Sequence, residues 1–237
     1  EGRALARLCH PGIVRLIEHN DRVQLPYLLL EHVGSQTLRD RLKEQGLFGI
    51  EEAINIVQHV GAAIAYAHER GYIHRDLKPS NIIMRNGRPV LLDFGVVWTW
   101  KDGRRPPDFS GTPQYLAPEQ ISREPLTPRT DIYGLGVLLF ELLTGARPFR
   151  ASEAYTDSHA TLAARYPQLT EDPPPLRRLN RKVPEELQAV ITRALQRDPN
   201  ERCESVADYL MALDQFTNTK IWPHDAVGNS IHFSPFK

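Results

Sequence analysis

The segment His-Arg-Asp-Leu-Lys-Pro-Ser-Asn, residues 74–81, constrains this chain more than any other part of the sequence. It places a carboxylate, an ammonium and a carboxamide close together, at Asp76, Lys78 and Asn81. Taken alone, such a run could be an ordinary polar loop, so its weight depends on the residues that follow. Asn86-Gly87 lies between two short apolar runs and is a strong hairpin signal, which predicts a two-stranded ribbon directly after the segment.

The predicted ribbon creates a candidate metal site. Its strands are Ile82-Ile83 and Val90-Leu91-Leu92, and the turn between them brings Asn81 and Asp93 to neighbouring ends. Carboxylate and carbonyl oxygens are the ligands that Mg²⁺ prefers in proteins, with phosphate oxygens completing its shell. The sequence therefore predicts that Asn81 and Asp93 hold a magnesium ion.

Two further motifs follow in a fixed order. Asp93-Phe94-Gly95 comes directly after the ribbon, and Ala117-Pro118-Glu119 closes a longer loop beyond it. Together with residues 74–81 they match the H-R-D-L-x-x-x-N, D-F-G and A-P-E motifs of the protein kinases. The chain therefore resembles the catalytic domain of serine/threonine protein kinases. The resemblance covers roughly residues 1–216 and is closest in style to the bacterial, Hanks-type branch.

The resemblance implies a role for each polar residue of the cleft. Asp76 would orient the substrate hydroxyl and accept its proton, and Lys78 would place its ammonium near the γ-phosphate. A lysine at this position is typical of serine/threonine rather than tyrosine specificity. Asn81 and Asp93 would hold Mg²⁺. The implied cofactors are ATP and Mg²⁺, and the implied substrate is a protein with a serine or threonine hydroxyl.

Five further residues are expected around the nucleotide. Glu1 matches the glutamate of the small-lobe helix, and Leu30 falls at the gatekeeper position. Glu31 and Val33 would supply the hinge backbone groups that bond adenine, and Ile83 is also assigned to the nucleotide site.

The implied fold is a two-lobed, protein-kinase-like α+β fold, with a small lobe reduced to the end of one helix plus two strands and a mainly helical large lobe. The expected domains are a small-lobe remnant over 1–33, the large lobe over 34–216, and a tail or linker over 217–237. Apolar patterning predicts strands over 13–17 and 25–30, although this part alone could be any amphipathic hairpin. Patterning also predicts helices over residues 37–45, 131–144, 151–165, 184–196 and 206–213, and a long helix that begins at Ile50 and is ended by Gly71.

The resemblance also implies specific contacts inside the large lobe. Asp131 matches the acidic residue that bonds the backbone of the catalytic loop, and Arg202 matches an arginine that pairs with Glu119. Thr112 is expected to hydrogen-bond the catalytic aspartate and lysine.

Composition excludes several classes of function. Lys+Arg and Asp+Glu both number 29, and this zero net charge gives no argument for binding nucleic acid or an anionic membrane. Cys9 and Cys203 have no framework spacing, which indicates two reduced thiols in a cytoplasmic protein. The longest apolar run, over 134–143, is too short to cross a bilayer.

One part of the kinase pattern is missing from these 237 residues. No G-x-G-x-x-G loop occurs, and the first lysine, Lys43, lies beyond the hinge. Active kinases need both a Gly-rich loop and a small-lobe lysine. Three readings stay open: an N-terminally truncated piece of a kinase with weak or no activity, a pseudokinase that acts as a scaffold, or a domain completed by another polypeptide. The small lobe would keep an exposed sheet edge that invites association, so a homodimer is also expected as one form of the protein.

Overall fold

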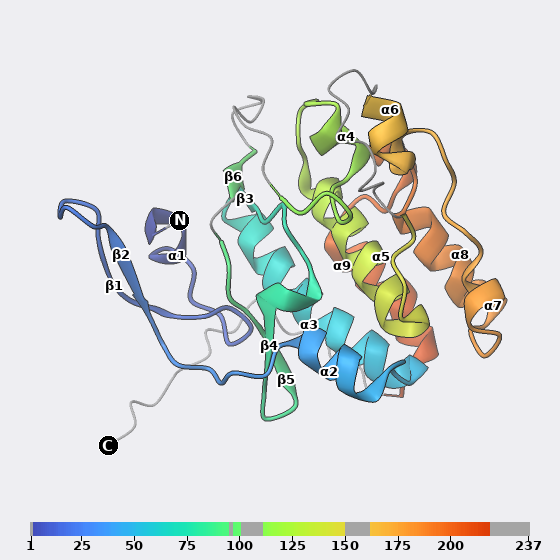
Figure 1. Cartoon of the computed structure of the whole chain (residues 1–237), viewed down its shortest axis with the longest axis horizontal. Helices are drawn as coiled ribbons and strands as arrows, with labels where there is room; N and C mark the ends of the chain where they lie inside the picture. The colour runs from blue at the N-terminus through green and yellow to red at the C-terminus, as the bar shows by residue number, and fades with distance from the viewer. Residues whose placement is uncertain (1, 95–96, 101–110, 150–161, 219–237) are drawn as a thin grey trace.

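The computed structural model describes residues 2–94, 97–100, 111–149 and 162–218. Figure 1 shows a helical body around α3 and α5, with the β1–β2 hairpin at one side of it. The mixed α+β, kinase-like fold that was expected from the sequence is confirmed. Among the described residues, no helix is both long enough and apolar enough to cross a membrane.

The strands of the described residues form antiparallel pairs. These pairs are β1 (Leu16–Asn20) with β2 (Tyr27–Leu30), β3 (Tyr72–Ile73) with β6 (Trp98–Thr99), and β4 (Ile82–Arg85) with β5 (Arg88–Leu91). The α-helices are α1 (Gly2–Leu5), α2 (Leu38–Gln45), α3 (Ile50–Glu69), α4 (Pro118–Ile121), α5 (Pro128–Thr144), α6 (Leu162–Arg165), α7 (Leu176–Leu179), α8 (Glu185–Ala194) and α9 (Val206–Leu213). Short 3₁₀ turns are η1 (Pro79–Asn81), η2 (Pro167–Leu169), η3 (Pro199–Glu201) and η4 (Asp214–Phe216).

Helix α5 forms the centre of the core. Every residue from 130 to 143 is buried, because the sequence is apolar on almost all faces of the helix. The Thr127 side chain caps its first turn and Pro128 occupies the first helical position, where a missing N–H costs nothing. Gly145 ends the helix in the left-handed conformation, with φ 69°. Helices α3, α8 and α9 pack against this central helix.

The helix predictions hold where the structure describes the chain. Thr37 forms a capping box with Asp40 at the start of α2, and α9 spans the predicted residues 206–213. The predicted helix over 151–165 falls mostly outside the described residues, which include only α6 of it. The tail over 219–237 also lies outside them.

The first strand begins later than the sequence predicts. The apolar alternation over 13–17 predicts a strand there, whereas β1 begins at Leu16. Ile13 and Val14 are buried against the β4–β5 ribbon instead, and Val14 N–H donates to the Leu91 carbonyl at 2.8 Å. Alternation reports which side chains are buried, but it cannot tell which strand provides the burial.

The β4–β5 ribbon forms as predicted. Asn86 and Gly87 both have positive φ, 51° and 79°, which is the conformation that a two-residue hairpin turn requires. Ile82 pairs with Leu91 at the open end of the ribbon. Asn81, which precedes Ile82, and Leu92, which follows Leu91, therefore lie together at that end.

Candidate active site

The catalytic loop, residues 74–81, is held in place by one buried carboxylate. Asp131, in the first turn of α5, accepts the His74 N–H at 2.8 Å and the Arg75 N–H at 2.9 Å. Arg75 has φ 74°, a left-handed conformation that an L-residue keeps only when its surroundings enforce it. The predicted contact of Asp131 with the loop backbone is therefore present.

A glycine in α5 lets the loop approach the helix closely. A Cβ added to Gly134 would lie only 3.2 Å from Leu77 Cβ, so a larger residue there would push the loop away. Leu77 itself is buried in the core. The loop thus rests on α5 through packing as well as through hydrogen bonds.

Asp76, Lys78, Asn81 and Thr112 form one hydrogen-bonded cluster. The Lys78 ammonium donates to Asp76 Oδ2 and, at 2.6 Å, to Thr112 Oγ1. Asn81 Nδ2 donates to the same Oδ2 at 3.1 Å, and the Thr112 N–H donates to Asp76 Oδ1 at 2.9 Å. The three sequence-predicted catalytic residues are thus brought together, and Thr112 contacts Asp76 and Lys78 as expected.

This cluster keeps Asp76 ionised. Burial alone would raise the pKa of Asp76, but the Lys78 ammonium and the Thr112 N–H stabilise the carboxylate and hold the net pKa below its usual value. A buried aspartate that stays charged near neutral pH can accept a hydrogen bond from an incoming hydroxyl.

Asn81 and Asp93 lie at the same end of the β4–β5 ribbon. The Leu92 N–H donates to the Asn81 carbonyl at 2.9 Å, which places Asp93 one residue beyond this bond. Because Asn81 Nδ2 points to Asp76, the Oδ1 atom of the same amide is the one left for a cation. The two side chains therefore fit a magnesium ion, which commonly takes only one or two protein ligands and completes its shell with phosphate and water.

Phe94 connects the segment of Asp93 to the catalytic loop. Its ring meets the His74 imidazole edge to face, with centroids 4.9 Å apart and an interplanar angle of 72°. Burial lowers the pKa of His74, so the imidazole is neutral at pH 7 and packs as an apolar ring. Leu5 and Leu16 belong to or pack against the same apolar cluster as Phe94.

The expected hinge residues follow β2 directly. Glu31 and Val33 come after Leu30, and among the described residues no backbone group bonds the Glu31 carbonyl or the Val33 N–H. Ile83 is buried, and a Cβ added to Gly34 would lie 3.5 Å from its Cγ2, so it borders the hinge. Glu1, the expected small-lobe glutamate, lies outside the described residues.

Sequence reasoning missed His68 as a member of this site. Its Nε2 lies 2.7 Å from Asp131 Oδ2, beneath the catalytic loop. One signal could have found it: His68 follows Ile64 by four residues on α3, so it lies on the buried face of that helix.

Gln120 was missed as well. This buried side chain donates through Nε2 to the Arg75 carbonyl at 2.9 Å and accepts the Ala117 N–H at 3.0 Å. Both backbone groups of Arg75 are thus hydrogen-bonded, its N–H to Asp131 and its carbonyl to Gln120. No pattern in the sequence distinguishes Gln120 from a surface glutamine.

Tyr115 and Glu141 form a further buried pair beside Thr112, in the segment 111–117 that we call the substrate loop. The phenol donates to Glu141 Oε2 at 2.6 Å and accepts a hydrogen bond from Arg39 at 3.2 Å. Burial raises the pKa of both groups, and the proximity of the Glu141 carboxylate raises that of the phenol further. Arg39 and Arg147 partly offset the charge of Glu141.

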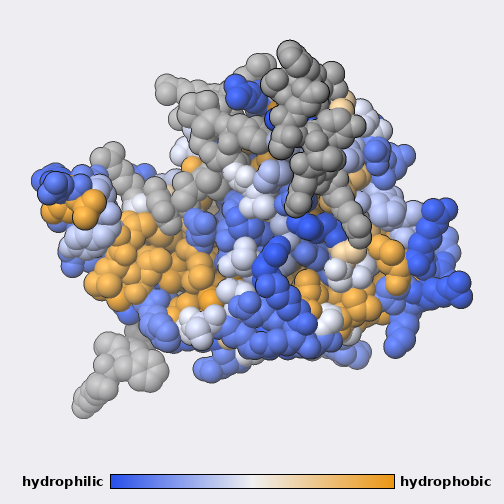
Figure 2. All heavy atoms as spheres, viewed as in Figure 1, coloured by the Kyte–Doolittle hydropathy of each residue, from blue (hydrophilic) through white to orange (hydrophobic). Residues whose placement is uncertain are grey.

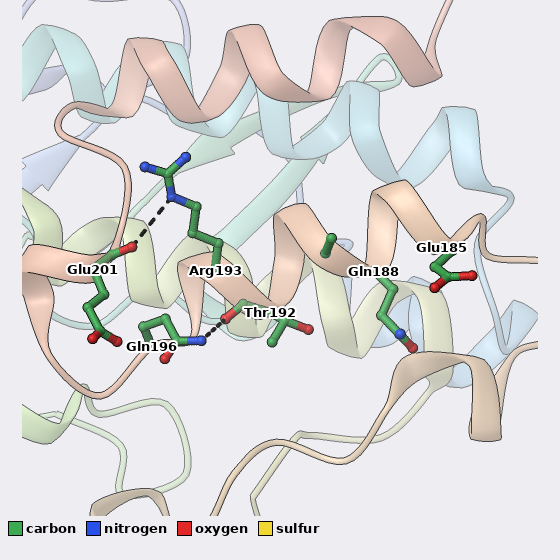
Figure 3. Close-up of a pocket in the computed structure, with 7 residues that line it drawn as sticks. Glu185, Gln188, Thr192, Arg193, Gln196 and Glu201 are labelled. Atoms are coloured by element: carbon green, nitrogen blue, oxygen red, sulfur yellow. Dashed lines mark hydrogen bonds between the residues drawn. The ribbon is translucent and has the colours of Figure 1, made fainter.

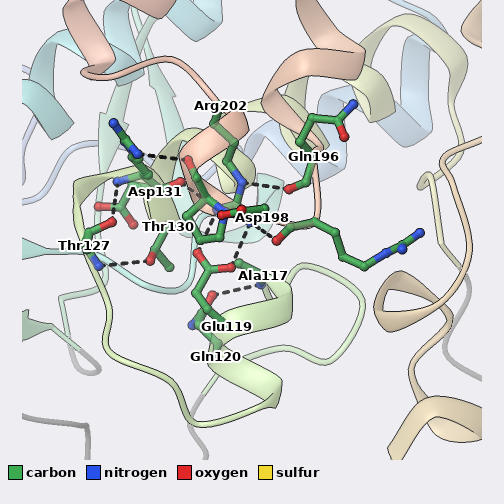
Figure 4. Close-up of polar contacts among 12 residues, drawn as sticks. Ala117, Glu119, Gln120, Thr127, Thr130, Asp131, Gln196, Asp198 and Arg202 are labelled. Carbon is green, nitrogen blue, oxygen red and sulfur yellow. Dashed lines mark hydrogen bonds and ion pairs between the residues drawn. The ribbon is translucent and has the colours of Figure 1, made fainter.

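The expected pairing of Glu119 with Arg202 is present and fully buried (Figure 4). Arg202 Nη1 and Nη2 donate to the two carboxylate oxygens at 2.7 and 2.8 Å. The three remaining N–H groups donate to the carbonyls of Arg129, Gln196 and Arg197, so all five donors of the guanidinium have acceptors. Figure 4 shows how the pair ties α4 to the segment that precedes α9.

The comparison with protein families identifies one match. The family model described as "Protein kinase domain" matches residues 1–213. This range covers the catalytic loop, the β4–β5 ribbon, the Glu119–Arg202 pair and α9.

Individual relatives are bacterial proteins named as serine/threonine kinases. The chain is 35% identical over 217 residues to serine/threonine-protein kinase PknB of Mycolicibacterium smegmatis, covering 88% of this chain and 34% of the relative. It is 34% identical over 218 residues to PksC of Streptomyces coelicolor, covering 86% and 38%. It is 32% identical over 211 residues to PrkC of Bacillus subtilis, covering 88% and 32%. The chain therefore spans about a third of the length of these relatives.

Proposed function

Because this chain belongs to the protein kinase family, we propose that it transfers the γ-phosphate of ATP to serine and threonine hydroxyls of proteins. The observation that carries the proposal is the cluster of Asp76, Lys78 and Thr112. A binding module has no need of a buried, ionised aspartate bonded to both a lysine and the substrate loop.

The proposed chemistry assigns a role to each member of the cluster. Asp76 Oδ1 accepts the hydrogen bond of the substrate hydroxyl, aligns its oxygen with the phosphate and receives the proton as transfer proceeds. Lys78 stabilises negative charge on the transferred group, and its bond to Thr112 fixes the ammonium in position. Asn81 and Asp93 hold Mg²⁺, which, when bound with ATP, neutralises charge on the phosphates.

We assign the nucleotide base to the hinge. In this proposal the Glu31 carbonyl and the Val33 N–H bond adenine, Leu30 is the gatekeeper residue, and Ile83 also borders the nucleotide. Glu1 is the proposed small-lobe glutamate. The corresponding division is a small-lobe part over 1–33, a large lobe over 34–216 joined at Gly34, and a tail over 217–237.

We expect the 237 residues by themselves to transfer phosphate weakly or not at all. They contain no Gly-rich loop, and no lysine precedes Lys43. A loss of about 5 kcal/mol of transition-state stabilisation would slow the reaction by more than about a thousandfold.

The β1–β2 hairpin supports a proposal about association. It exposes apolar side chains, with Ile17 54%, Leu25 81% and Leu29 48% exposed, and Figure 2 shows apolar residues gathered over this part of the molecule. An exposed apolar surface of this kind favours association with another protein. The simplest such assembly is a homodimer in which the hairpins of two chains pack together. The unpaired thiols of Cys9 and Cys203 fit a reducing cytoplasm as its location.

The second candidate function is that of a pseudokinase that binds protein partners without phosphotransfer. The two functions differ in whether the cleft binds nucleotide in a metal-dependent manner.

The test is a thermal unfolding titration of the 237-residue chain with Mg·ATP. A ligand that binds only the folded state stabilises it by about 2.7 kcal/mol at 100 times its Kd, which raises Tm by several degrees. We expect this rise for the wild type and for the surface control Asp172→Asn, and its loss in Asp93→Asn. Once a small lobe with a Gly-rich loop and a lysine has been joined to the N-terminus, transfer of labelled phosphate to serine/threonine rather than tyrosine peptide libraries tests specificity. No rise at millimolar Mg·ATP would favour the pseudokinase function.

A further inference from the structure

Two arginines from separate elements flank one tyrosine of the substrate loop. Arg39, in the first turn of α2, donates through Nη2 to the Tyr115 phenol at 3.2 Å. Arg147, which follows the end of α5, has its guanidinium carbon over the Tyr115 ring, 6.0 Å from the ring centroid. Both arginines are only partly buried, so each guanidinium keeps some of its surface in contact with solvent. The fold thus gathers two positive charges around a single side chain.

These two charges exceed the negative charge beside them. The carboxylate of Glu141 lies there and accepts the Tyr115 phenol at 2.6 Å. Among the described residues neither Arg39 nor Arg147 forms an ion pair, and Arg147 donates no hydrogen bond. The neighbouring acid of α2, Asp40, is directed at the helix cap instead, where it accepts the Thr37 N–H at 3.1 Å. One carboxylate therefore faces two guanidinium groups at Tyr115.

The arginine pair lies one turn from the catalytic aspartate. The Tyr115 N–H donates to the Thr112 carbonyl at 2.9 Å, and the Thr112 N–H donates to Asp76 Oδ1 at 2.9 Å. The Cα atoms at the two ends of such a turn lie less than about 7 Å apart. An extended peptide covers about 3.5 Å per residue, so a substrate residue beside Tyr115 lies about two to four positions from a hydroxyl bound at Asp76.

The chemistry of the arginine pair favours an anion. A guanidinium presents a planar fork of N–H donors that matches a carboxylate or a phosphate group. It is also more weakly hydrated than an ammonium, so less free energy is needed to remove its water. A basic side chain at the same place would meet two like charges. An anion beside Tyr115 instead interacts with both guanidinium groups at once.

We propose that Arg39 and Arg147 select protein substrates that carry an anionic side chain about two to four residues from the acceptor hydroxyl. The anion is the carboxylate of an aspartate or glutamate, or the phosphate of a residue that is already phosphorylated. The two guanidinium groups donate to it, while the Tyr115 phenol keeps its bond to Glu141. This inference rests on the function proposed above and deepens it, because it names the class of substrate.

The experiment is an NMR titration of the ¹⁵N-labelled 237-residue chain with nine-residue peptides, in the absence of nucleotide. Each peptide has a central threonine among alanine and glycine, and one glutamate is placed in turn two, three or four positions before or after it. Matched peptides carry glutamine, which is isosteric and uncharged, or lysine, which has the opposite charge. We expect saturable shifts of the Arg39 and Arg147 Nε–H signals with at least one glutamate peptide. Its Kd should be about fivefold below that of the glutamine peptide, and lysine should bind most weakly.

A further peptide distinguishes the two sources of the anion. It carries phosphoserine at the position where glutamate binds best. A Kd below that of the glutamate peptide would assign the site to substrates that are already phosphorylated, and an equal or higher Kd would assign it to acidic segments. Both results support selection of an anion, provided that the glutamine peptide binds more weakly than either.

Variants assign the preference to the two arginines. Arg39→Gln and Arg147→Gln are each expected to raise the Kd of the glutamate peptide about threefold and to leave that of the glutamine peptide unchanged. Arg39→Lys keeps the charge and should retain most of the preference. The backbone signal of Thr112 shows whether loss of the bond from Arg39 to Tyr115 has moved the substrate loop.

Arg193→Gln is the matched control, because it removes a positive charge from a helix that does not contribute to the arginine pair. Figure 3 shows Arg193 on α8 beside a cavity of about 570 Å³. Its Nε donates to the Glu201 carbonyl at 3.4 Å, on an exposed part of the surface. We expect this variant to bind the glutamate peptide with an unchanged Kd.

The titration needs neither Mg·ATP nor phosphotransfer, so its result is separate from that of the thermal unfolding experiment. Equal Kd values for the glutamate, glutamine and lysine peptides would overturn the selection of an anion, even in a chain that binds Mg·ATP. An unchanged preference in both Arg→Gln variants, or no saturable shift with any peptide, would overturn it as well. A preference that depends on both arginines in a chain that does not bind Mg·ATP would leave the anion site in place and remove only the phosphotransfer.

Discussion

His68 Nε2 and Asp131 Oδ2 lie 2.7 Å apart and join the end of α3 to the first turn of α5 beneath the catalytic loop. The same carboxylate accepts the backbone N–H groups of His74 and Arg75. One buried side chain thus fixes two helices and the start of the loop that carries Asp76. Removal of its charge should affect the whole fold.

Asp131→Asn should lower the free energy of unfolding by about 3 kcal/mol at pH 7, because it replaces a buried carboxylate that is hydrogen-bonded to His68 and to the N–H groups of His74 and Arg75. Asparagine keeps one acceptor oxygen but directs an NH₂ group at groups that themselves donate. Urea unfolding measures the loss. Asp172→Asn, whose side chain is 94% exposed, is the control and should change stability by less than about 0.5 kcal/mol.

The difference in stability between the wild type and Asp131→Asn should depend on pH. Burial alone would raise the pKa of Asp131, but the hydrogen bonds from His68 and from the His74 N–H hold its net pKa below the usual value. A lowered folded-state pKa stabilises the fold above the unfolded value of about 3.9 and loses this effect as the pH falls. The stability difference between wild type and Asp131→Asn should therefore be full at pH 7 and shrink below about pH 4. A constant difference across this range would contradict the assignment.

Arg202→Lys should be much more damaging than its conservation of charge suggests. All five N–H groups of the guanidinium are bonded inside the protein, and an ammonium cannot reach both Glu119 oxygens and three carbonyls. We expect a loss of about 3 kcal/mol in the free energy of unfolding.

The control for this substitution is Arg177→Lys. Arg177 pairs with Glu185 at 3.2 Å on the surface, where both side chains are about half exposed or more. Its replacement should cost less than about 1 kcal/mol. Similar losses for the two variants would mean that the buried fork is not what stabilises the lobe.

Contacts that depend on neighbouring residues in the sequence could be predicted. Contacts between elements far apart in the sequence could not be predicted from the residue pattern alone, because they depend on how those elements pack. Asn86-Gly87 alone fixed the ribbon that brings Asn81 to the end where Asp93 follows, because the turn chemistry admits few alternatives. The pair of Glu119 and Arg202, 83 residues apart, came only through resemblance to the kinase family.

The missed contacts have a common physical cause. His68 and Gln120 bond to Asp131 and Arg75, far away in the sequence, and the partner of a buried polar side chain depends on how elements pack. The late start of β1 has a related cause, since Ile13 is buried by the ribbon rather than by a neighbouring strand.

Gln120→Leu should destabilise the chain by about 1–3 kcal/mol, because it removes the buried hydrogen bonds of Gln120 to the Arg75 carbonyl and the Ala117 N–H. Local effects should appear as faster hydrogen exchange at Ala117 and at the loop amides of His74 and Arg75. Gln215→Leu, on an exposed side chain, is the matched control. Unchanged exchange at all three amides would show that Gln120 does not hold the loop.

Gly111 and Gly49 provide a comparison of two alanine substitutions that differ only in local geometry. Gly111 has φ 125°, and an added Cβ would lie 2.5 Å from Leu116 Cδ2 and 3.6 Å from Asp76 Oδ1. Gly49 has φ −63° and an added Cβ would meet nothing within 4 Å. Gly111→Ala should therefore cost about 1–3 kcal/mol of backbone strain and displace the Thr112 N–H from Asp76.

Gly49→Ala should by contrast leave the free energy of unfolding within about 1 kcal/mol of wild type, since its backbone conformation suits any residue and the gain in unfolded-state rigidity offsets the weaker cap. Urea unfolding gives both values, and the ¹⁵N signal of Thr112 reports its bond to Asp76. The Thr112 signal should move only in Gly111→Ala. If it stayed in place while stability fell, the strain would be absorbed away from the catalytic cluster, and Gly111 would be a structural glycine of the loop rather than one that positions Thr112 against Asp76.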